Sequence, residues 1–228
     1  MLSIDLHTHS GASFDGRDSV ELLLEQAVAV GLDAIAVTDH DEISASREAV
    51  SLAPEYDLIA IPGMEVSSAD GHILSLGTDT LIQAGLPFRE TVERIRDSGG
   101  IAVVPHPFQE SRSGVLANIS KQELAIADAI EVYNSRLLTG FSNRQARMFA
   151  SRRGLPMTAG SDAHICEMVG QAVTKVDPPD PTADGILEEI KAGRTATDGK
   201  RTPWRISLRQ AAGGLRRRIA HRLPGIEQ

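Results

Sequence analysis

The chain has one cysteine, Cys166, among its 228 residues. A single cysteine excludes an internal disulfide and a zinc cluster built from cysteine thiolates. No apolar run reaches the roughly 20 residues that a membrane-spanning helix needs. No basic segment followed by an apolar stretch stands at the start of the chain, which argues against a secretory signal. These absences make a cytoplasmic location the expectation.

Motifs of several common enzyme classes are also missing. The sequence contains no Gly-x-Gly-x-x-Gly dinucleotide fingerprint, no phosphate-binding P-loop and no Gly-x-Ser-x-Gly nucleophile elbow. It has no internal repeats and no low-complexity tracts. With 41% hydrophobic and 24% charged residues, the composition is that of a globular protein, and the length suits a single α/β barrel.

Most of the histidines occupy one kind of position, at the start or end of a short apolar, strand-like run with a carboxylate nearby. Side chains two residues apart in a strand point to the same side, so His7 and His9 aim both imidazoles at one point. Converging imidazoles form half of a metal site. A lone His-x-His pair also arises by chance, but the repeated pattern favours a metal site. The pattern comprises His7, His9, His40, Glu65, His72, His106, Asp162 and His164.

The apolar periodicity predicts strands that alternate with helices. Such alternation requires parallel pairing with right-handed crossovers, and the loops after the strands then converge on one mouth. Asp18 or Ser19 is expected to cap the first helix, Ser44 the second, and the Gly63-Met-Glu65 stretch is expected to form a turn. Helices are predicted over about 19–30, 44–53, 87–98, 120–126, 141–153 and 182–192, and strands over about 1–9, 34–38, 58–61, 72–77, 101–104, 129–133, 156–159, 171–176 and 196–198.

The motifs together resemble those of the PHP family, the polymerase and histidinol phosphatase domains. The resemblance rests on His7-Thr-His9, Thr38-Asp-His40, Glu65, His72, His106-Pro107 and Gly160-Ser-Asp162-Ala-His164, and it covers about residues 1–198. It implies an α/β fold, a distorted (β/α)7 barrel with a cluster of two to three divalent metal ions at its C-terminal mouth. We therefore expect a PHP phosphoesterase domain over residues 1–199 and a separate tail over 200–228.

The resemblance also implies how the ligands divide among three metal positions. Asp15 is the least firmly placed, because many family members have a histidine there and a plain loop carboxylate is the alternative. An aspartate followed by Gly16 resembles the branch that hydrolyses nucleotide phosphates, and Asp18 is expected to serve as a helix cap instead. The first position would use His7, His9, Glu65 and Asp162, the second Glu65, His72 and His106, and the third Asp15, His40 and His164.

The residue types suit hydrolysis of a phosphate ester. Mixed imidazole and carboxylate ligands favour Mn²⁺, Zn²⁺ or Fe²⁺. A bridging carboxylate such as Glu65 would hold two ions about 3.5–4 Å apart, and such ions activate water and neutralise phosphoryl charge. Asp5 and Asp39, which adjoin ligands, are expected to accept hydrogen bonds from ligand N–H groups. The proton donor to the leaving group stays open.

Substrate contacts are predicted from the loops that follow strands. Arg112, Asn134 and Arg136 lie on such loops, and arginine binds phosphate in a bidentate manner. The alternative for each arginine is an ordinary surface position. Glu131 is expected to have a structural role or to support a ligand, and Cys166 to be a buried apolar side chain rather than a ligand.

The charge is uneven along the chain. From Lys200 onward there are eight Lys or Arg residues and one acidic residue, Glu227, whereas the chain as a whole has a net charge of −8. The tail reads as a basic, partly amphipathic helix interrupted at Gly213-Gly214, with His221 exposed to solvent. It either packs on the acidic body or binds nucleic acid, anionic lipid or a protein partner.

The sequence thus predicts a metal-dependent phosphoesterase for a small phosphorylated substrate, for example a 3′,5′-nucleoside bisphosphate. Histidinol phosphate is an alternative substrate, which Asp15 and the short chain disfavour. Exonuclease action with a partner is a second alternative. A PHP-like regulatory module is a third, and the retained ligand residues argue against it.

Overall fold

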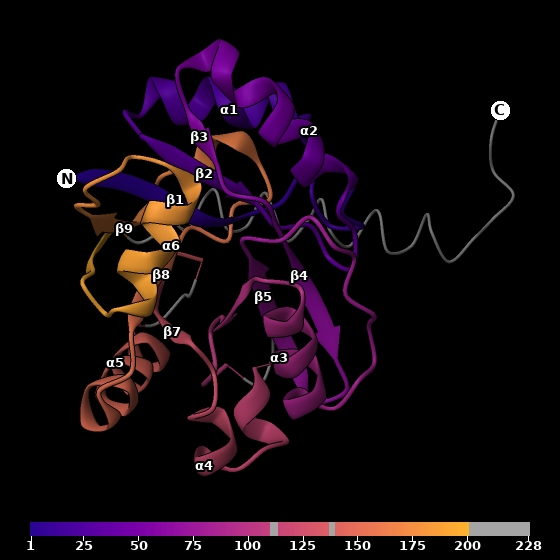
Figure 1. The fold of residues 1–228 in the computed structure, drawn as a ribbon, viewed down its shortest axis with the longest axis vertical. Helices are drawn as coiled ribbons and strands as arrows, with labels where there is room; N and C mark the ends of the chain where they lie inside the picture. Colours follow the sequence, from indigo (N-terminus) through magenta and orange to yellow (C-terminus); the bar gives the residue numbers. More distant parts are fainter. Residues whose placement is uncertain (110–113, 137–139, 201–228) are drawn as a thin grey trace, which may run out of the picture.

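The computed structural model describes residues 1–109, 114–136 and 140–200 and contains two five-stranded sheets (Figure 1). The first sheet has the order β10-β9-β1-β2-β3 and the second the order β4-β5-β6-β7-β8. The strands of the first are β1 (Leu2–Thr8), β2 (Ala34–Val37), β3 (Ile59–Ala60), β9 (Ala172–Val176) and β10 (Ala196–Gly199). Those of the second are β4 (Gly63–Ser68), β5 (Gly71–Leu76), β6 (Ile101–Val104), β7 (Ala129–Asn134) and β8 (Met157–Gly160).

Helices cover the outer faces of the sheets. Figure 1 shows α1 and α2 beside the first sheet and α3 beside β4 and β5 of the second. The reason is amphipathicity: α3 buries Phe88, Val92 and Ile95, which share one helix face, and leaves its arginines outside. The helices are α1 (Val20–Ala29), α2 (Ser44–Leu52), α3 (Phe88–Asp97), α4 (Lys121–Leu124), α5 (Phe141–Arg153) and α6 (Ala183–Lys191).

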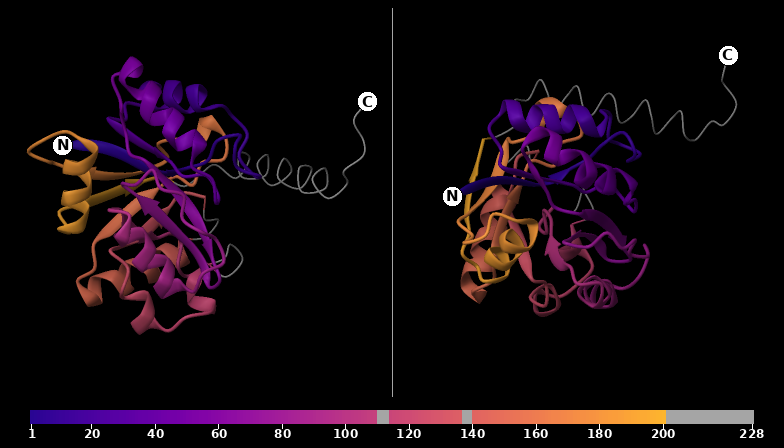
Figure 2. Two further views of the ribbon diagram at one scale, coloured as in Figure 1. Left: turned by 45° about the vertical axis from the view of Figure 1, so that its right-hand side comes forward. Right: turned by 45° about the horizontal axis from the view of Figure 1, so that its top comes forward.

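The two sheets meet at the ends of their strands, where isolated bridges pair Thr8 with Ala163 and His40 with Glu65. The amide of His9 donates to the carbonyl of Ala163 at 2.7 Å, and the amide of Glu65 donates to the carbonyl of Asp39 at 3.1 Å. In both views of Figure 2 the strands of the two sheets lie in the middle of the molecule, with the helices on the outside. These backbone contacts bring the residues that follow β1, β2 and β8 into one region with β4.

The strand pairing corrects the expectation of an all-parallel barrel. Pairs β1–β2, β2–β3, β6–β7 and β7–β8 are parallel, but β4–β5, β5–β6, β1–β9 and β9–β10 are antiparallel. Strands β4 and β5 are joined only by Ala69 and Asp70, too few residues for the crossover that parallel pairing requires. The result is a mixed α/β fold, and among the described strands hydrogen bonding does not close a (β/α)7 barrel.

Most predicted helices and strands are observed, one of the two residues expected to cap the first helix does so, and two local predictions are wrong. Ser19 caps α1 by accepting from the amide of Leu22, whereas Asp18 does not cap. Ser44 is the first residue of α2, and the Glu42 carboxylate accepts from its amide instead. Gly63 to Glu65 belongs to β4 rather than to a turn, because each residue pairs with β5.

In the described part of the chain no helix combines the length and apolar character required to cross a membrane. The predicted basic tail, apart from Lys200, lies outside the described residues, as does Arg112.

Candidate metal centre

The predicted ligand residues lie together where the two sheets meet. Most of them are fully buried, and His40, His72 and Asp15 are partly exposed at the rim. They come from many elements: His7 from β1, Glu65 from β4 and His72 from β5, with the others in loops. His9 and Asp15 follow β1, His40 follows β2, His106 follows β6, and Asp162 and His164 follow β8.

The first group forms around one oxygen of Glu65. Its Oε2 lies 3.2 Å from Nε2 of His7 and 3.2 Å from Nε2 of His9. Oδ1 of Asp162 lies 4.0 Å and 3.8 Å from the same two nitrogens. The atoms that would bind a cation therefore face a common point, as they would in the first predicted metal position.

The second group uses the other oxygen of the same carboxylate. Oε1 of Glu65 lies 2.9 Å from Nδ1 of His72 and 3.5 Å from Nε2 of His106. Oε2 also lies 3.4 Å from Nδ1 of His40, so the two oxygens of Glu65 face different sets of imidazoles. This is the arrangement that a carboxylate bridging two cations needs.

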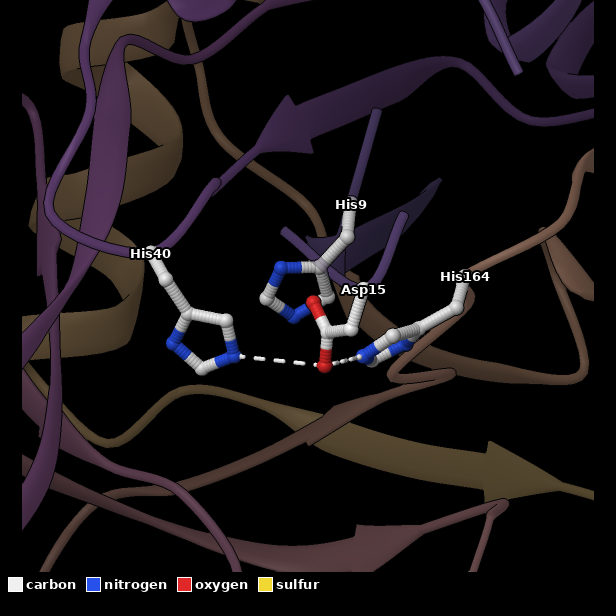
Figure 3. Close-up of side chains that lie close together, drawn as sticks. All are labelled: His9, Asp15, His40 and His164. Atoms are coloured by element: carbon white, nitrogen blue, oxygen red, sulfur yellow. Dashed lines mark hydrogen bonds and ion pairs between the residues drawn. The ribbon is translucent and has the colours of Figure 1, made fainter. Parts of the chain in front are cut away.

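The third group surrounds Asp15 and is drawn in Figure 3. Oδ2 of Asp15 lies 2.7 Å from Nε2 of His164 and 3.7 Å from Nε2 of His40. The His9 ring stands behind them, with its centroid 4.3 Å from that of His164. Asp15 therefore lies among the histidines rather than on a remote part of the loop.

Unsatisfied buried atoms indicate that these groups suit a cation. Nε2 of His9 and Oε1 of Glu65 are buried and, although Glu65 and His72 stand 3.2 Å and 2.9 Å away, they form no well-aligned hydrogen bond with a described residue. Buried polar atoms normally have a partner, because leaving one without it costs about 1–3 kcal/mol. Imidazole nitrogens with carboxylate oxygens fit Mn²⁺, Zn²⁺ or Fe²⁺.

The carboxylates of the centre are held in their charged form. Burial favours neutral Glu65, but the charges of His40, His72 and His7 outweigh it and hold its pKa well below the usual range. Burial also favours the neutral form of Asp15, but hydrogen bonds with His164 and His40 outweigh this effect and lower the pKa of its carboxyl. Glu65 and Asp15 therefore offer negatively charged oxygens to a cation.

The imidazoles respond in opposite directions. Burial opposes protonation of His40, yet Glu65 and Asp15 raise its pKa to about 9. Burial and the neighbouring His164 lower the pKa of His9 to about 4. The pKa of His164 is lowered by burial and by Arg136. His9 and His164 thus keep the neutral form that binds metal ions.

The backbone is strained next to the ligands. His106 has φ 32° and Asp162 has φ 54°, both in the left-handed region that side chains other than glycine seldom adopt. Such strain persists where surrounding contacts fix it, and it concentrates at functional sites. In the loop before α1, Gly16 packs so closely on Ser10 that a Cβ would overlap the Ser10 carbonyl.

Asp5 and Asp39 support the loops rather than the ligand rings. Asp5 accepts from the amides of Ser161 at 2.9 Å and Gly170 at 2.8 Å. Asp39 accepts from the amide of Ser10 at 2.7 Å and from its hydroxyl at 2.6 Å. The expectation that they accept from ligand N–H groups holds only for the backbone amide of His7, 3.3 Å from Asp5.

Two of the predicted substrate residues are in the described structure. Nη1 of Arg136 lies 3.1 Å from Oδ1 of Asp162 and 2.7 Å from Nε2 of His164, so its guanidinium reaches the ligand cluster. The side-chain amide of Asn134 donates to Glu131 at 2.9 Å and to Asp162 at 3.2 Å. Both amide hydrogens therefore point at carboxylates, which suits a supporting role better than phosphate binding.

Sequence reasoning missed one aromatic side chain beside the cluster, Phe14, and misjudged the burial of Cys166. Phe14 stacks on the His40 ring with centroids 4.9 Å apart and is about half exposed. Its only sequence signal is its position beside Asp15. Cys166 lies outside the histidine cluster as expected, but it is only partly buried, and burial together with Asp18 raises the pKa of its thiol to about 11.

Comparisons with known proteins agree with this geometry. Residues 5–141 match the PHP domain family, and residues 140–195 match a PHP-associated family. The uncharacterized protein MJ1587 of Methanocaldococcus jannaschii is 31% identical over 155 residues, which are 64% of this chain and 89% of that protein. The phosphoribosyl 1,2-cyclic phosphate 1,2-diphosphodiesterase of Eggerthella lenta is 38% identical over 81 residues, covering 33% of this chain and 30% of that enzyme.

A solved structure shows the same fold. It is a two-domain protein from Bacteroides vulgatus that contains a predicted PHP-like metal-dependent phosphoesterase. It superposes with a TM-score of 0.75 at 21% identity and covers 87% of this chain. This chain spans 64% of that structure, so the match concerns one part of the larger protein.

Proposed function

The chain belongs to the PHP family, and on that premise we propose that it is a metal-dependent phosphoesterase that hydrolyses a small phosphomonoester. One observation carries the proposal: histidines and carboxylates from both sheets converge on three adjoining groups, two of which share Glu65. PHP proteins are metal-dependent hydrolases of phosphoesters. A chain that had lost this chemistry would have no reason to keep so costly a buried polar cluster.

The residues divide the work of holding cations and substrate. His7, His9, Glu65 and Asp162 would hold one ion, Glu65 with His72 and His106 a second, and Asp15 with His40 and His164 a third. Bound divalent ions would supply an activated water and neutralise charge on the phosphoryl group. The buried, charged Glu65 would contribute to both of the first two positions, because its two oxygens face different sets of imidazoles.

Arg136 is the residue proposed to bind the phosphate. Its guanidinium reaches the ligand cluster from the loop after β7, and it is about one-fifth exposed, so the side chain lies between the metal centre and solvent. Arginine forms paired hydrogen bonds with phosphate oxygens. Arg112, which lies outside the described residues, remains a proposal of the same kind.

The substrate proposed is a small phosphate ester, with nucleotides first. Asp15 lies among the histidines of the third group, as expected for the branch that acts on nucleotide phosphates. The Eggerthella relative, by its name, cleaves a phosphodiester of a sugar phosphate, which supports phosphoester chemistry on a small molecule. Histidinol phosphate is the second substrate to test.

The test combines metal content with turnover. Purified protein is analysed for bound metal and then assayed with Mn²⁺ against nucleotides, nucleoside bisphosphates, histidinol phosphate and simple sugar phosphates. We expect two to three ions per chain and release of inorganic phosphate from one class of substrate. His9→Ala should abolish turnover, whereas His221→Ala, which changes a histidine of the predicted basic tail, should not.

A different result would overturn the proposal. One ion or none per chain, with no turnover under Mn²⁺, Zn²⁺ or Fe²⁺, would leave a regulatory or partner-dependent role. Equal activity of His9→Ala and the unchanged protein would place the reaction elsewhere.

A second function is favoured by the charge of the tail, which carries eight basic residues and one acidic residue from Lys200 onward. A basic segment binds nucleic acid mainly through phosphates, and such binding weakens steeply as salt increases. Removing residues 203–228 tests it. Salt-sensitive oligonucleotide binding that disappears with the tail would favour a nucleic-acid role, while small-ester turnover that survives the truncation favours the first proposal.

A further inference from the structure

A second glutamate lies beneath the metal centre. Glu131 stands in β7, is 1% exposed, and belongs to none of the three groups described above. Its carboxylate reaches from the second sheet to β1 in the first. A buried carboxylate needs several hydrogen-bond donors, since an unpaired buried charge is strongly destabilising.

Three nitrogen atoms lie within hydrogen-bond distance of this carboxylate. Oε1 lies 3.0 Å from Nδ1 of His7. Oε2 accepts from the backbone amide of His106 at 3.1 Å and from the side-chain amide of Asn134 at 2.9 Å. Each of the three partners is either a predicted metal ligand or, in the case of Asn134, a donor to the ligand Asp162 at 3.2 Å.

From this geometry we infer that Glu131 is a positioning residue that keeps the hydrogen of His7 on Nδ1 and leaves Nε2 free to bind a metal ion. An imidazole that donates through one nitrogen presents the lone pair of the other. Nε2 of His7 is the atom that faces Glu65, at 3.2 Å, and Asp162, at 4.0 Å. The inference rests on the metal-binding part of the proposed function and concerns no substrate.

The surrounding chain is shaped to admit this carboxylate. A Cβ on Gly160 in β8 would stand 2.7 Å from Oε1 of Glu131 and 2.5 Å from Cβ of His7. Both distances are shorter than side chains tolerate, so only glycine leaves room for the pair. The hydrogen bond to the His106 amide also holds a residue whose φ is 32°, so the carboxylate fixes a strained ligand backbone as well.

A change from carboxylate to amide gives a sharp test. In Glu131→Gln the side-chain oxygen takes the position of Oε2, because only an oxygen can accept from both the His106 and the Asn134 amide. The amide nitrogen must then face Nδ1 of His7 and donate to it, because two donors cannot pair. His7 is thereby driven to the tautomer with its hydrogen on Nε2, the atom required for metal binding.

The experiment compares Zn²⁺-loaded protein with and without Glu131→Gln. Zinc affinity is measured by competition with a chelator, and zinc per chain by elemental analysis. Nitrogen-15 spectra of the imidazoles report which nitrogen of His7 carries the hydrogen, and the two proteins are compared in this respect without metal, because zinc on Nε2 would exclude a hydrogen there. Glu189→Gln is the matched control. Glu189 lies in α6 and is also nearly buried, but its carboxylate pairs with Arg194, away from the histidines.

We expect Glu131→Gln to lower zinc affinity at the first position by about 10–100-fold, the range seen when residues supporting metal-bound histidines are changed. The His7 hydrogen should move from Nδ1 to Nε2. Glu189→Gln should change neither quantity. Circular dichroism of the metal-free proteins verifies that both variants are folded.

Three outcomes would overturn the inference. One is unchanged zinc affinity in a folded Glu131→Gln, and another is a His7 hydrogen that stays on Nδ1 in that variant. The third needs no variant: a hydrogen on Nε2 of His7 in the unchanged, zinc-loaded protein. Failure of the unchanged protein to bind any metal would instead refute the proposed function itself.

Discussion

At the scale of single residues, the Glu65 carboxylate lies between two groups of imidazoles. Its two oxygens face different partners, His7, His9 and His40 on one side and His72 and His106 on the other. An amide in this place would offer one oxygen and one N–H₂ donor, and the donor cannot bind a cation.

We therefore expect Glu65→Gln to lose at least one bound metal ion per chain and to reduce kcat/KM by at least about 100-fold, since metal ions supply several kcal/mol of charge stabilisation. Elemental analysis and steady-state kinetics measure both. Full metal content in the variant would show that Glu65 is not a bridge.

Arg136 gives a second prediction at this scale. If it binds the phosphate, Arg136→Gln should lower kcat/KM by about 10–100-fold, because hydrogen bonds to charged groups contribute about 1.5–3 kcal/mol. The control is Arg94→Gln, which removes an exposed arginine paired with Glu90 in α3. Equal effects of the two changes, or none, would remove Arg136 from the substrate site.

The sequence predicts which side chains gather at the candidate site better than it predicts the residues that support them. Motif residues such as His40 and Asp162 are recognisable because chemistry demands particular side chains at strand ends. The partners of Asn134 depend on side-chain rotamers and on residues from three strands, which no local pattern encodes. Asp5 illustrates the limit, because it adjoins the ligands in sequence yet holds the backbone of Ser161 and Gly170.

At the scale of elements, the loop between β1 and α1 contains Asp15 and, next to it, Gly16, which packs against Ser10. Gly16→Ala would force its Cβ against the Ser10 carbonyl and move Asp15 away from His164. We expect the third metal position to weaken while the other two persist, seen as one ion fewer per chain.

A neighbouring glycine serves as the control for that change. A Cβ at Gly11 would meet its nearest atom, the Arg17 carbonyl oxygen, at 3.4 Å, which is ordinary contact. Gly11→Ala should therefore keep the metal content of the unchanged protein. If both alanines behave alike, the loop adapts and Asp15 does not depend on Gly16.

Helices are more predictable than strand pairing in this chain. The period of apolar residues determines α5 and α6 almost to the residue, because each helix buries one local face. Pairing direction depends on connections instead, and β1 pairs antiparallel with β9 across the sequence. Alternation alone therefore predicts an α/β fold but not its mixed sheets.

At the scale of the whole molecule, the candidate metal centre lies where the two sheets meet. Ligands from β1 and β4 would bind the same ion, so cations should stabilise the folded state. An ion present at 100 times its dissociation constant adds about 2.7 kcal/mol. At about 2–4 °C per kcal/mol for a chain of this size, chelation should lower Tm by roughly 5–10 °C.

Calorimetry with EDTA and then with excess Mn²⁺ measures this effect. Restoration of the original Tm by Mn²⁺ would show that chelation acts through the centre. The same Tm in both conditions would contradict a role for metal ions in holding the sheets together.

The central place of β1 also bears on how the protein is made. Strand β1 lies between β2 and β9, and the Asp5 carboxylate is bonded by the amide of Gly170, 165 residues further along the chain. On the ribosome, β1 must wait for partners that are synthesised much later, while His7 and His9 are already outside the exit tunnel. Under the proposed function, a chain that ends before His164 would lack one of the proposed ligands, so the full set of ions could be held only after His164 has emerged.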